Sequence, residues 1–381
     1  MPTRRDTARP SRRLPRHPQR WYVGLALLAG LVAAAFGDPI DADATARDGE
    51  LTTTTVAPSP APAQTFLLTH VDADRRADLY ILVGLQEGGD DGTAVLVPAA
   101  TLVEVPAFGL QTLADLPRLA GIEAVETTVE NALALGIDRV IALDDDLLAR
   151  AMAPLGALTV EFRRPVQVED DAGTVSFAAG EQEITAADAV RLLSAPDPDG
   201  ELAHLVTVRA VFDGWRAALR DREVAAAVFE IADLGPVRRA GRADLRYETL
   251  PVESVTTAGD ERLALRRADV AELVDRSFGW ARLGDGDRAK VEILNGTGGV
   301  GVTQVVARIV VPAGVEVTLT NNVPGFGVEE TVVVYYRDRD ADEARRLVEV
   351  LGVGRVAKGD SAIQVVDLSI IVGADFPLPT S

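Results

Sequence analysis

A run of seventeen residues without a single charge, Trp21–Gly37, constrains this chain more than any other stretch. Seven arginines and one acidic residue precede it within residues 1–20. A basic flank before an apolar run, with Trp21 and Tyr22 at the boundary, is typical of a membrane segment whose N-terminus stays in the cytoplasm. At 1.5 Å per residue the run spans about 26 Å, close to the thickness of a hydrocarbon core. We predict a basic cytoplasmic tail over 1–20 and a transmembrane anchor over 21–37.

A cleaved signal peptide is the alternative, because Ala33, Ala34 and Ala35 are small residues of the kind that a signal peptidase accepts. The long basic flank and the length of the apolar run favour the uncleaved anchor. In both cases nearly all of the chain lies outside the cytoplasm. We therefore expect a single-pass protein of the plasma membrane, and mass spectrometry separates the two cases because cleavage leaves a start near Phe36.

Charge and composition exclude several classes of function. The chain carries 38 basic and 58 acidic side chains, a formal net charge of −20, and such a chain lacks the basic face that binding to nucleic acid requires. It has no cysteine, which excludes disulfides, thiolate metal sites and a cysteine nucleophile. With only three histidines, one of them (His17) in the tail, a multi-histidine metal centre is also excluded.

Changes in sequence pattern divide the exported part of the chain. Residues 38–64 contain Pro58, Pro60 and Pro62 and little to bury, which predicts an extended extracytoplasmic linker. From 65 to 280, short apolar runs bounded by turn residues alternate with helical periodicity, which predicts an α/β/α layered domain. One amphipathic helix there is marked by the apolar residues Leu205, Val208, Phe212 and Trp215.

A polar hinge at 281–289 precedes a second, smaller unit. Its pattern predicts strands at 290–294, 315–319, 331–336 and 367–373 and helices at 302–311 and 340–351. The order βαββαβ fits a small ferredoxin-like sandwich. The fold class is therefore α/β, with two different domains.

Some motifs suggest chemistry but have a simpler structural interpretation. Gly296–Gly301 follows a predicted strand and precedes a helix, as a dinucleotide-binding loop does. The acid expected at the end of the next strand is missing, since Thr320 and Asn321 stand there, so a structural tight turn is favoured. The triplet Asp144–Asp146 is favoured as a helix cap over a cation site.

The two histidines outside the tail carry no recognisable catalytic spacing. His70 and His204 have no local carboxylate or serine pattern, so an ordinary structural role is expected for each. The chain contains no Gly-x-Ser-x-Gly elbow, no His-Glu-x-x-His pair and no Walker loop.

Strings of the second unit resemble a known family. Val291–Gly298, Val332–Tyr336 and Ile370–Phe376 closely resemble the C-terminal domain of LytR–CpsA–Psr (LCP) proteins, over residues 290–376. Residues 65–280 resemble a diverged copy of the catalytic LCP domain that precedes it, through four strings: Pro98–Gly109, Gly136–Val140, Leu155–Val160 and Ile184–Val190. The resemblance implies membrane-anchored cell-envelope proteins that ligate glycopolymers outside the cell.

The resemblance also implies a ligand and a set of site residues. The family's substrate is a polyprenyl-diphosphate-linked glycan, held by several arginines with Mg²⁺ on acidic residues, because arginine forks and a metal offset concentrated negative charge. Three matching positions survive in this chain: Arg75, Arg76 and Asp78.

The other arginine positions of the family pattern are replaced. Pro98-Ala99-Ala100 stands where the family has Pro-Arg-Asp, and Ser194-Ala195-Pro196 stands where it has Arg-x-Arg. The segment His204–Val208 replaces an Arg-x-x-Arg-Gln string. Since the loss of one such donor costs about 10²–10³ in rate, the site is expected to have lost its grip on a diphosphate.

We therefore expect no catalytic residues and a binding or scaffolding component of cell-wall glycopolymer assembly, with a lipid-linked precursor, a glycopolymer or an envelope protein as partner. One alternative is an active transferase with a reduced site, Mg²⁺ as its cofactor and help from arginines such as Arg191 or Arg209. Another is a regulatory module that binds protein through an edge strand. Three or more arginines converging on one pocket would favour the enzyme, and one or none would favour its loss.

Overall fold

The computed structural model describes residues 61–170, 173–231, 234–257, 260–284, 286–360 and 365–378. The predicted tail, the predicted anchor and residues 38–60 of the predicted linker lie outside these ranges. Among the described residues, no helix is both long enough and apolar enough to cross a bilayer. The described residues belong to one compact unit that contains two separate five-stranded sheets, and the domain boundary at 281–289 stays a prediction.

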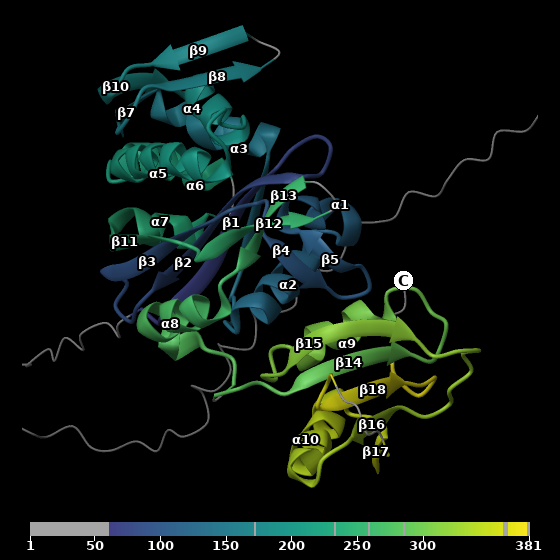
Figure 1. The fold of residues 1–381 in the computed structure, drawn as a ribbon. Helices are drawn as coiled ribbons and strands as arrows, with labels where there is room; N and C mark the ends of the chain where they lie inside the picture. Colours follow the sequence, from purple (N-terminus) through teal and green to yellow (C-terminus); the bar gives the residue numbers. More distant parts are fainter. Residues whose placement is uncertain are drawn as a thin grey trace, which may run out of the picture. The chain divides into compact units, whose positions relative to one another are not determined.

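The first sheet has the strand order β11-β3-β2-β1-β6 (Figure 1). Its central strand β2 runs antiparallel to both β1 and β3, while the edge strands β6 and β11 lie parallel to β1 and β3 respectively. The strands are β1 (Gln64–Val71), β2 (Ala77–Leu85), β3 (Asp91–Val97), β6 (Val140–Asp144) and β11 (Asp244–Thr249).

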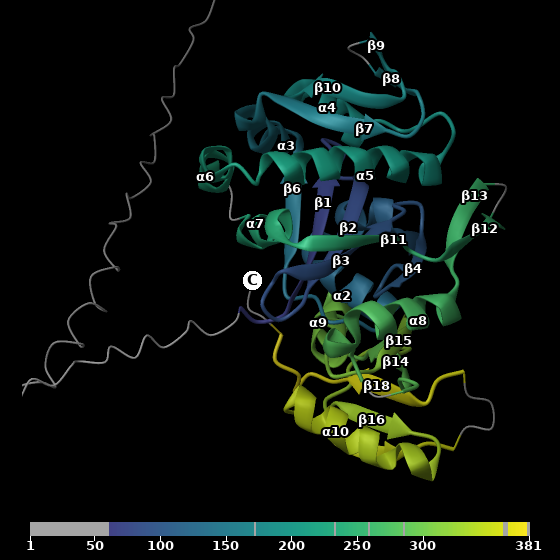
Figure 2. The same cartoon turned by 90° about the vertical axis from the view of Figure 1, so that its left-hand side faces the viewer.

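Both faces of this sheet are buried. In β2 the side chains of Leu79 and Ile81 join one apolar core and those of Tyr80 and Leu82 join the other, because successive residues of a strand point to opposite faces. Helices cover each face (Figure 2). On the first face are α3 (Asp145–Met152), α4 (Ala186–Ser194), α5 (Glu201–Ala218), α6 (Arg222–Ile231) and α7 (Gly235–Arg242); on the second are α1 (Leu116–Ala120), α2 (Glu123–Leu133) and α8 (Arg267–Phe278).

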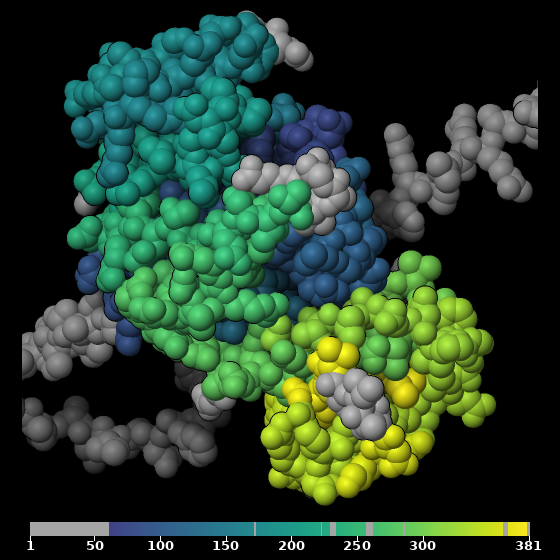
Figure 3. All heavy atoms as spheres, viewed as in Figure 1, coloured from purple at the N-terminus to yellow at the C-terminus, as the bar shows by residue number. Residues whose placement is uncertain are grey.

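This arrangement confirms the predicted α/β/α layers. The amphipathic helix expected around Leu205–Trp215 is α5, whose four marker residues are each at most 2% exposed. In the space-filling view the teal and green residues cover most of the purple strands (Figure 3). Four short antiparallel pairs complete this part: β4 (Leu102–Val105) with β5 (Gly109–Thr112), β7 (Ala157–Phe162) with β10 (Gly180–Thr185), β8 (Val166–Asp170) with β9 (Gly173–Phe177), and β12 (Val252–Thr257) with β13 (Asp260–Leu265).

The second sheet has the order β15-β14-β18-β16-β17. Its elements are β14 (Lys290–Asn295), α9 (Val302–Val310), β15 (Glu316–Asn322), β16 (Val332–Tyr335), α10 (Ala341–Leu351), β17 (Arg355–Lys358) and β18 (Leu368–Val372). All six predicted elements are present, and the mixed α/β class is confirmed. The short strand β17 was not anticipated, because a four-residue strand with charged residues at both ends carries little apolar signal.

The strand pairing of this sheet differs from the antiparallel sheet of a ferredoxin-like sandwich. Strand β14 lies parallel to both β15 and β18, β16 lies parallel to β17, and only β16 and β18 are antiparallel. The last strand therefore occupies the centre, where Leu368, Ile370 and Val372 are fully buried. Helices α9 and α10 contribute to one shared core with these strands.

Candidate functional site

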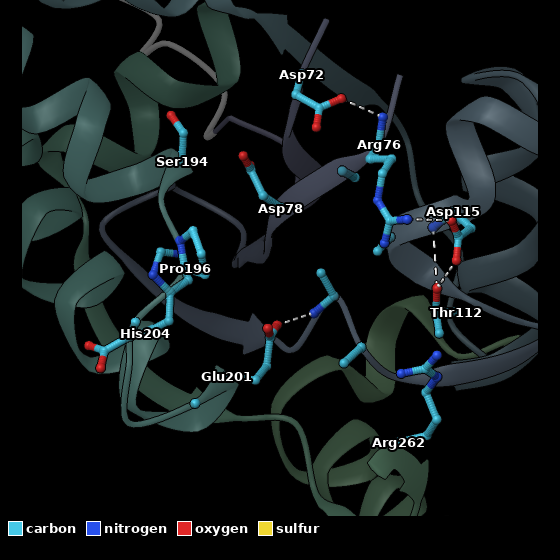
Figure 4. Close-up of a pocket in the computed structure, with 16 residues that line it drawn as sticks. Asp72, Arg76, Asp78, Thr112, Asp115, Ser194, Pro196, Glu201, His204 and Arg262 are labelled. Atoms are coloured by element: carbon cyan, nitrogen blue, oxygen red, sulfur yellow. Dashed lines mark hydrogen bonds and ion pairs between the residues drawn. The ribbon is translucent and has the colours of Figure 1, made fainter. Parts of the chain in front are cut away.

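A cavity of about 520 Å³ lies where the turn after β1, the end of β3 and the start of α5 meet (Figure 4). Its walls bring together segments that are far apart in the sequence and that the family resemblance had assigned to one site. They include Arg76 and Asp78, Ala99 and Ala100, Ser194 and Pro196, and His204. The substituted positions therefore face the same space as the surviving ones.

Two of the three predicted site residues line this cavity. Arg76 and Asp78 do, whereas Arg75 is not among the lining residues and its guanidinium approaches the carbonyl of Pro117 at 3.5 Å. Arg75 also has a left-handed backbone, with φ of 61°, because it sits in the turn between β1 and β2. A second arginine, Arg262, enters the cavity from β13 and was not anticipated. Two arginines therefore line the cavity. Three or more would have favoured an active enzyme and one or none its loss, so the count alone does not decide between them.

The charge of Arg76 is balanced by a carboxylate of the same cavity. Its Nη1 lies 3.1 Å from Oδ1 of Asp115. Asp115 also accepts hydrogen bonds from the Thr112 hydroxyl at 2.7 Å and from Arg118 at 2.9 Å. Burial alone would raise the pKa of Asp115, but these hydrogen bonds and the charge of Arg76 hold it below its usual value. This arginine is thus held by the protein itself.

His70 has the structural core role expected of it, and its partner is a carboxylate that local spacing does not reveal. It is fully buried, and its Nδ1 lies 2.8 Å from Oδ1 of Asp78, while Nε2 lies 3.2 Å from a carboxylate oxygen of Asp145. Burial opposes the charged imidazole, but the hydrogen bond and charge of Asp78 and the charge of Asp145 raise the pKa of His70. Burial also raises the pKa of Asp78, against the hydrogen bond from His70. The antiparallel register of β1 and β2, which no local spacing reveals, creates this pair.

Glu201 is the acidic residue that the sequence analysis missed. It is the first residue of α5, and its Oε1 accepts a hydrogen bond from the backbone N–H of Ala99 at 2.6 Å. The N–H of Ala100 also stabilises the carboxylate. Burial raises the pKa of Glu201, these backbone hydrogen bonds oppose the shift, and the charge of Asp78 adds to it. A signal was present, since Glu201 lies three residues before His204 and so on the same helix face.

His204 lines the cavity but lacks a hydrogen bond at one ring nitrogen. The residue is 4% exposed, and its Nε2 has no partner. The backbone of Leu193 accepts the hydrogen bond of the imidazole. Burial lowers the pKa of His204, although the charge of Asp197 opposes the shift, so the ring is neutral near pH 7. The unpartnered Nε2 is therefore an acceptor.

The carboxylates of the cavity do not fit a magnesium ion. Both oxygens of Asp78 lie within 3.0 Å of the same His70 nitrogen, and one oxygen of Glu201 is held by Ala99. Within the described part of the chain, no group of three or more potential ligands is placed to hold a metal ion. The Mg²⁺ that the family resemblance implies has no matching donor set here.

The other predicted features lie outside this cavity. The arginines considered for a reduced site are engaged elsewhere: Arg191 Nε donates to Asp170 at 2.6 Å, and Arg209 lies over the ring of Tyr247 at 4.6 Å from its centre. Asp144 caps α3, since its Oδ1 accepts from the N–H of Leu147 at 2.7 Å, which confirms the capping interpretation.

The glycine-rich loop after β14 is closed by a side chain of the protein. Oδ1 of Asn295 accepts from the N–H groups of Thr297 and Gly298 at 3.0 and 3.1 Å. Its Nδ2 donates to the carbonyl of Gly299 at 2.8 Å. Two loop N–H groups that a phosphate would use are therefore already satisfied, in agreement with a structural turn.

A comparison with protein-family models matches the C-terminal part of the chain. The family model described as LytR cell envelope-related transcriptional attenuator matches residues 288–376. The resemblance inferred from the sequence strings is thus confirmed over the second sheet and its helices. No protein in the curated collection matches the chain.

Several solved structures are similar at low identity. A transcriptional regulator from Enterococcus faecalis, EF0465, is 13% identical with a TM-score of 0.48, covering 57% of this chain and 88% of its own. TagV of B. subtilis is 14% identical with a TM-score of 0.48, covering 56% and 96%. The LytR-CPS2A-psr family protein YwtF (TagT), with bound octaprenyl pyrophosphate lipid, is 15% identical with a TM-score of 0.44, covering 57% and 91%.

Proposed function

We propose that the chain is a membrane-anchored, extracytoplasmic protein of cell-wall glycopolymer assembly that has lost transferase catalysis and serves as a binding or scaffolding component. The match of residues 288–376 to a cell-envelope family and the membrane segment predicted over 21–37 support this setting. The chemistry of the cavity supports the loss of catalysis.

The observation that carries the proposal is the position of the Glu201 carboxylate. Backbone N–H groups and the N-terminus of a long helix are the parts of a fold that attract a phosphate. Here the N–H of Ala99 is occupied by the carboxylate of Glu201, an anion that belongs to the chain and stands in the first turn of α5. An incoming diphosphate would have to displace this carboxylate and then face its charge.

The charge balance of the cavity adds to this effect. Five carboxylates line it, against two arginines: Asp72, Asp78, Asp115, Asp197 and Glu201 against Arg76 and Arg262. Clusters of arginine are what diphosphate recognition requires. A cavity with an acidic excess disfavours a lipid-linked diphosphate.

Binding of a polyprenyl diphosphate to the purified full-length chain, measured with and without Mg²⁺, tests the proposal. We expect no saturable binding in either condition. Tight, Mg²⁺-dependent binding would overturn the proposal and support an active transferase, the second candidate, which the unexpected second arginine in the cavity favours.

A matched pair of variants isolates the role of Glu201. Glu201→Ala removes the internal carboxylate and is expected to give measurable diphosphate affinity. Glu161→Ala removes a carboxylate from the wall of a different cavity and is expected to change nothing. Equal behaviour of the two variants would contradict the assignment of Glu201 as the group that excludes the diphosphate.

A further inference from the structure

Three apolar side chains lie on the segments that follow the parallel strands of the second sheet. Strand β14 is parallel to both β15 and β18, so the carboxyl ends of these three strands share one edge of the sheet (Figure 1). Val300 follows β14, Phe326 follows β15 and Leu378 follows β18. Val300 is fully exposed, Phe326 is 46% exposed and Leu378 is 38% exposed. We call these three residues the apolar tip.

Contacts with the glycine-rich loop after β14 bring the apolar tip together. A Cβ on Gly298 would lie 3.2 Å from Cγ of Phe326, and a Cβ on Gly299 would lie 3.5 Å from Cδ1 of Leu378. The Phe326 ring and the Leu378 side chain therefore lie against two successive glycines, and Val300 is the next residue. The loop that resembles a dinucleotide-binding loop in sequence thus forms the base of an exposed apolar patch.

The backbone at Phe326 has a conformation that aromatic residues rarely adopt. Its φ is 50°, in the left-handed region, and it lies between Gly325 and Gly327, whose φ angles are 84° and 78°. A residue with a Cβ is disfavoured in this region, and glycine is not. Strained residues cluster at sites that contact a ligand or a partner. The turn alone would be better made by glycine, so the exposed ring itself has a role.

No charge lies in the sequence segments that carry the apolar tip. Residues 293–307, 317–328 and 376–381 contain no acidic or basic side chain, although 25% of the residues of the whole chain are charged and its net charge is −20. Burial of a charge in apolar surroundings is costly, so an uncharged surface is the part of an acidic chain that can enter them. Contiguous exposed apolar side chains mark surfaces that contact a protein or a membrane.

We propose that the apolar tip docks on the surface of the lipid bilayer in which the chain is anchored. This inference rests on the part of the proposed function that places a membrane segment at 21–37. Residues 38–60 connect that segment to the described chain and can span at most about 80 Å, because an extended chain rises roughly 3.3–3.6 Å per residue. A compact domain of this length is about 50 Å across. The apolar tip can therefore reach the bilayer from any place on the surface of the domain.

The size of the apolar tip favours a bilayer over a second copy of the chain. A stable dimer buries about 800 Å² on each partner, and one exposed valine with two half-exposed side chains does not supply this area. Insertion of loop side chains into a bilayer needs less area, because the tether keeps them at high local concentration beside the lipid. The three uncharged segments also contain no lysine or arginine, so the contact does not depend on anionic lipid.

The absence of cysteine from the chain allows a direct test by spin labelling. A nitroxide is attached to Val300→Cys in the full-length chain, which is reconstituted into phosphatidylcholine liposomes. The matched control carries the label on Val350→Cys, an exposed position outside the apolar tip. Collisions with oxygen report lipid, and collisions with a water-soluble nickel complex report water. We expect the label at position 300 to meet nickel at least fivefold less often than the label at position 350. Equal accessibility to nickel at the two positions overturns the proposal.

A second pair of variants excludes insertion that is driven by the label itself. The label is moved to Leu378→Cys, and Val300→Asp is compared with Val350→Asp, since both substitutions add one negative charge at an exposed valine. We expect Val300→Asp to return the label to water and Val350→Asp to leave it protected from nickel. A label that stays protected in both variants overturns the proposal. Because Val300 is fully exposed, its replacement leaves the fold intact.

The same labelled chain separates the bilayer from a second copy and this inference from the proposed function. Protection from nickel that disappears when the chain is diluted in the lipid shows a contact between two copies, and overturns the proposal. A full-length chain that does not float with the liposomes refutes the anchor and this inference together. A chain that floats while its tip stays in water refutes this inference alone, because the loss of transferase catalysis is tested by the diphosphate.

Discussion

The two regions with a resemblance to LCP proteins, residues 65–280 and 290–376, differ in the role of the residues at the family's motif positions. In the second sheet the matching strings contain residues that hold the backbone in place. Asn295 closes the turn after β14, and Asp375 accepts hydrogen bonds from the N–H and hydroxyl of Thr331 at 2.8 and 2.7 Å. In the first region the positions that depart from the family pattern border a cavity.

The difference teaches where a chain is free to change. A residue that fixes a turn or fills a close approach cannot be replaced without cost to folding. A residue on a cavity wall contacts a ligand, and its replacement changes binding more than stability. The second sheet therefore matches the family model, while substitutions on the cavity wall of the first region are expected to change the charge of the cavity at little cost to folding.

The largest expected effect is at Gly373. A Cβ there would lie 2.4 Å from the backbone carbonyl carbon of Glu330 and 2.7 Å from the N of Thr331. Backbone cannot swing away as a flexible side chain can, so Gly373→Ala is expected to lower the free energy of unfolding by about 3 kcal/mol. Urea denaturation of the full chain measures it. Gly279→Ala is the control, because nothing lies within 4 Å of its Cβ position, and a similar loss there would refute the argument from close approach.

The sequence predicts those features of the fold that follow from residues close together in the chain, and it does not predict contacts between distant segments. Burial in α5 follows from the spacing of Leu205, Val208, Phe212 and Trp215, which is why that helix and its inner face could be predicted. The central place of β18 could not, because pairing between strands 77 residues apart depends on which strand is most apolar on both sides.

The site shows the same limit. The resemblance correctly indicated that Ala99, Ser194 and Pro196 would meet near Asp78. It did not indicate that Glu201 would supply an anion to Ala99, since the two residues are 102 positions apart. A hydrogen bond of this kind is visible only once the fold has placed the helix N-terminus.

The second prediction sharpens the comparison with a carboxylate that lies in the first region but outside the cavity. Glu130 is 5% exposed and its Oε1 accepts from the N–H of Ile137 at 2.9 Å. Burial raises the pKa of Glu130 to about 7, against the backbone hydrogen bond. The folded state then binds the proton more tightly than the unfolded state, so the free energy of unfolding falls as pH rises from about 4.5 to 7.

Glu130→Gln removes this titration. We expect the variant to gain about 3 kcal/mol relative to the parent at pH 8 and to gain nothing at pH 4, because the pKa of Glu130 rises from 4.5 to about 7 on folding and each pKa unit corresponds to about 1.4 kcal/mol. Denaturation across this pH range measures the difference. Parallel pH profiles for parent and variant would show that Glu130 does not titrate in this window.

The third prediction concerns the turn after β14. Asn295→Ala removes two acceptor contacts to N–H groups and the donation to the Gly299 carbonyl, and it is expected to lower the free energy of unfolding by about 2 kcal/mol. Asn295→Asp keeps the accepting oxygen but sets a second oxygen against the Gly299 carbonyl, a repulsion that disappears when the carboxyl group is protonated, so its cost should fall to about half of the alanine cost only at low pH. If both variants cost the same at low pH, the acceptor oxygen is not what holds the turn.

The fourth prediction, with the smallest expected effect on stability, tests whether residues on the cavity wall can be replaced without loss of the fold. Ser194→Arg with Pro196→Arg restores guanidinium groups at two cavity positions where the family resemblance places arginine. Pro196 is exposed, and Ser194 ends α4, where a cation interacts favourably with the helix dipole. The free energy of unfolding should therefore change by no more than about 0.5 kcal/mol. Combined with Glu201→Ala, the same pair should raise the affinity for a polyprenyl diphosphate at least tenfold.

A charge-matched control decides whether the gain in diphosphate affinity comes from the position of the two arginines or from the added net charge. Val350→Arg with Val365→Arg adds the same two charges at exposed residues that do not line the cavity. Binding gained only by the cavity pair shows that the wall, and not the overall charge of the chain, determines which ligand enters. Binding gained equally by both pairs, or a cavity pair that unfolds the protein, would break the distinction between residues that hold the fold and residues that line the cavity. The wall could then not have changed independently of the fold, and its acidic residues would need a structural explanation.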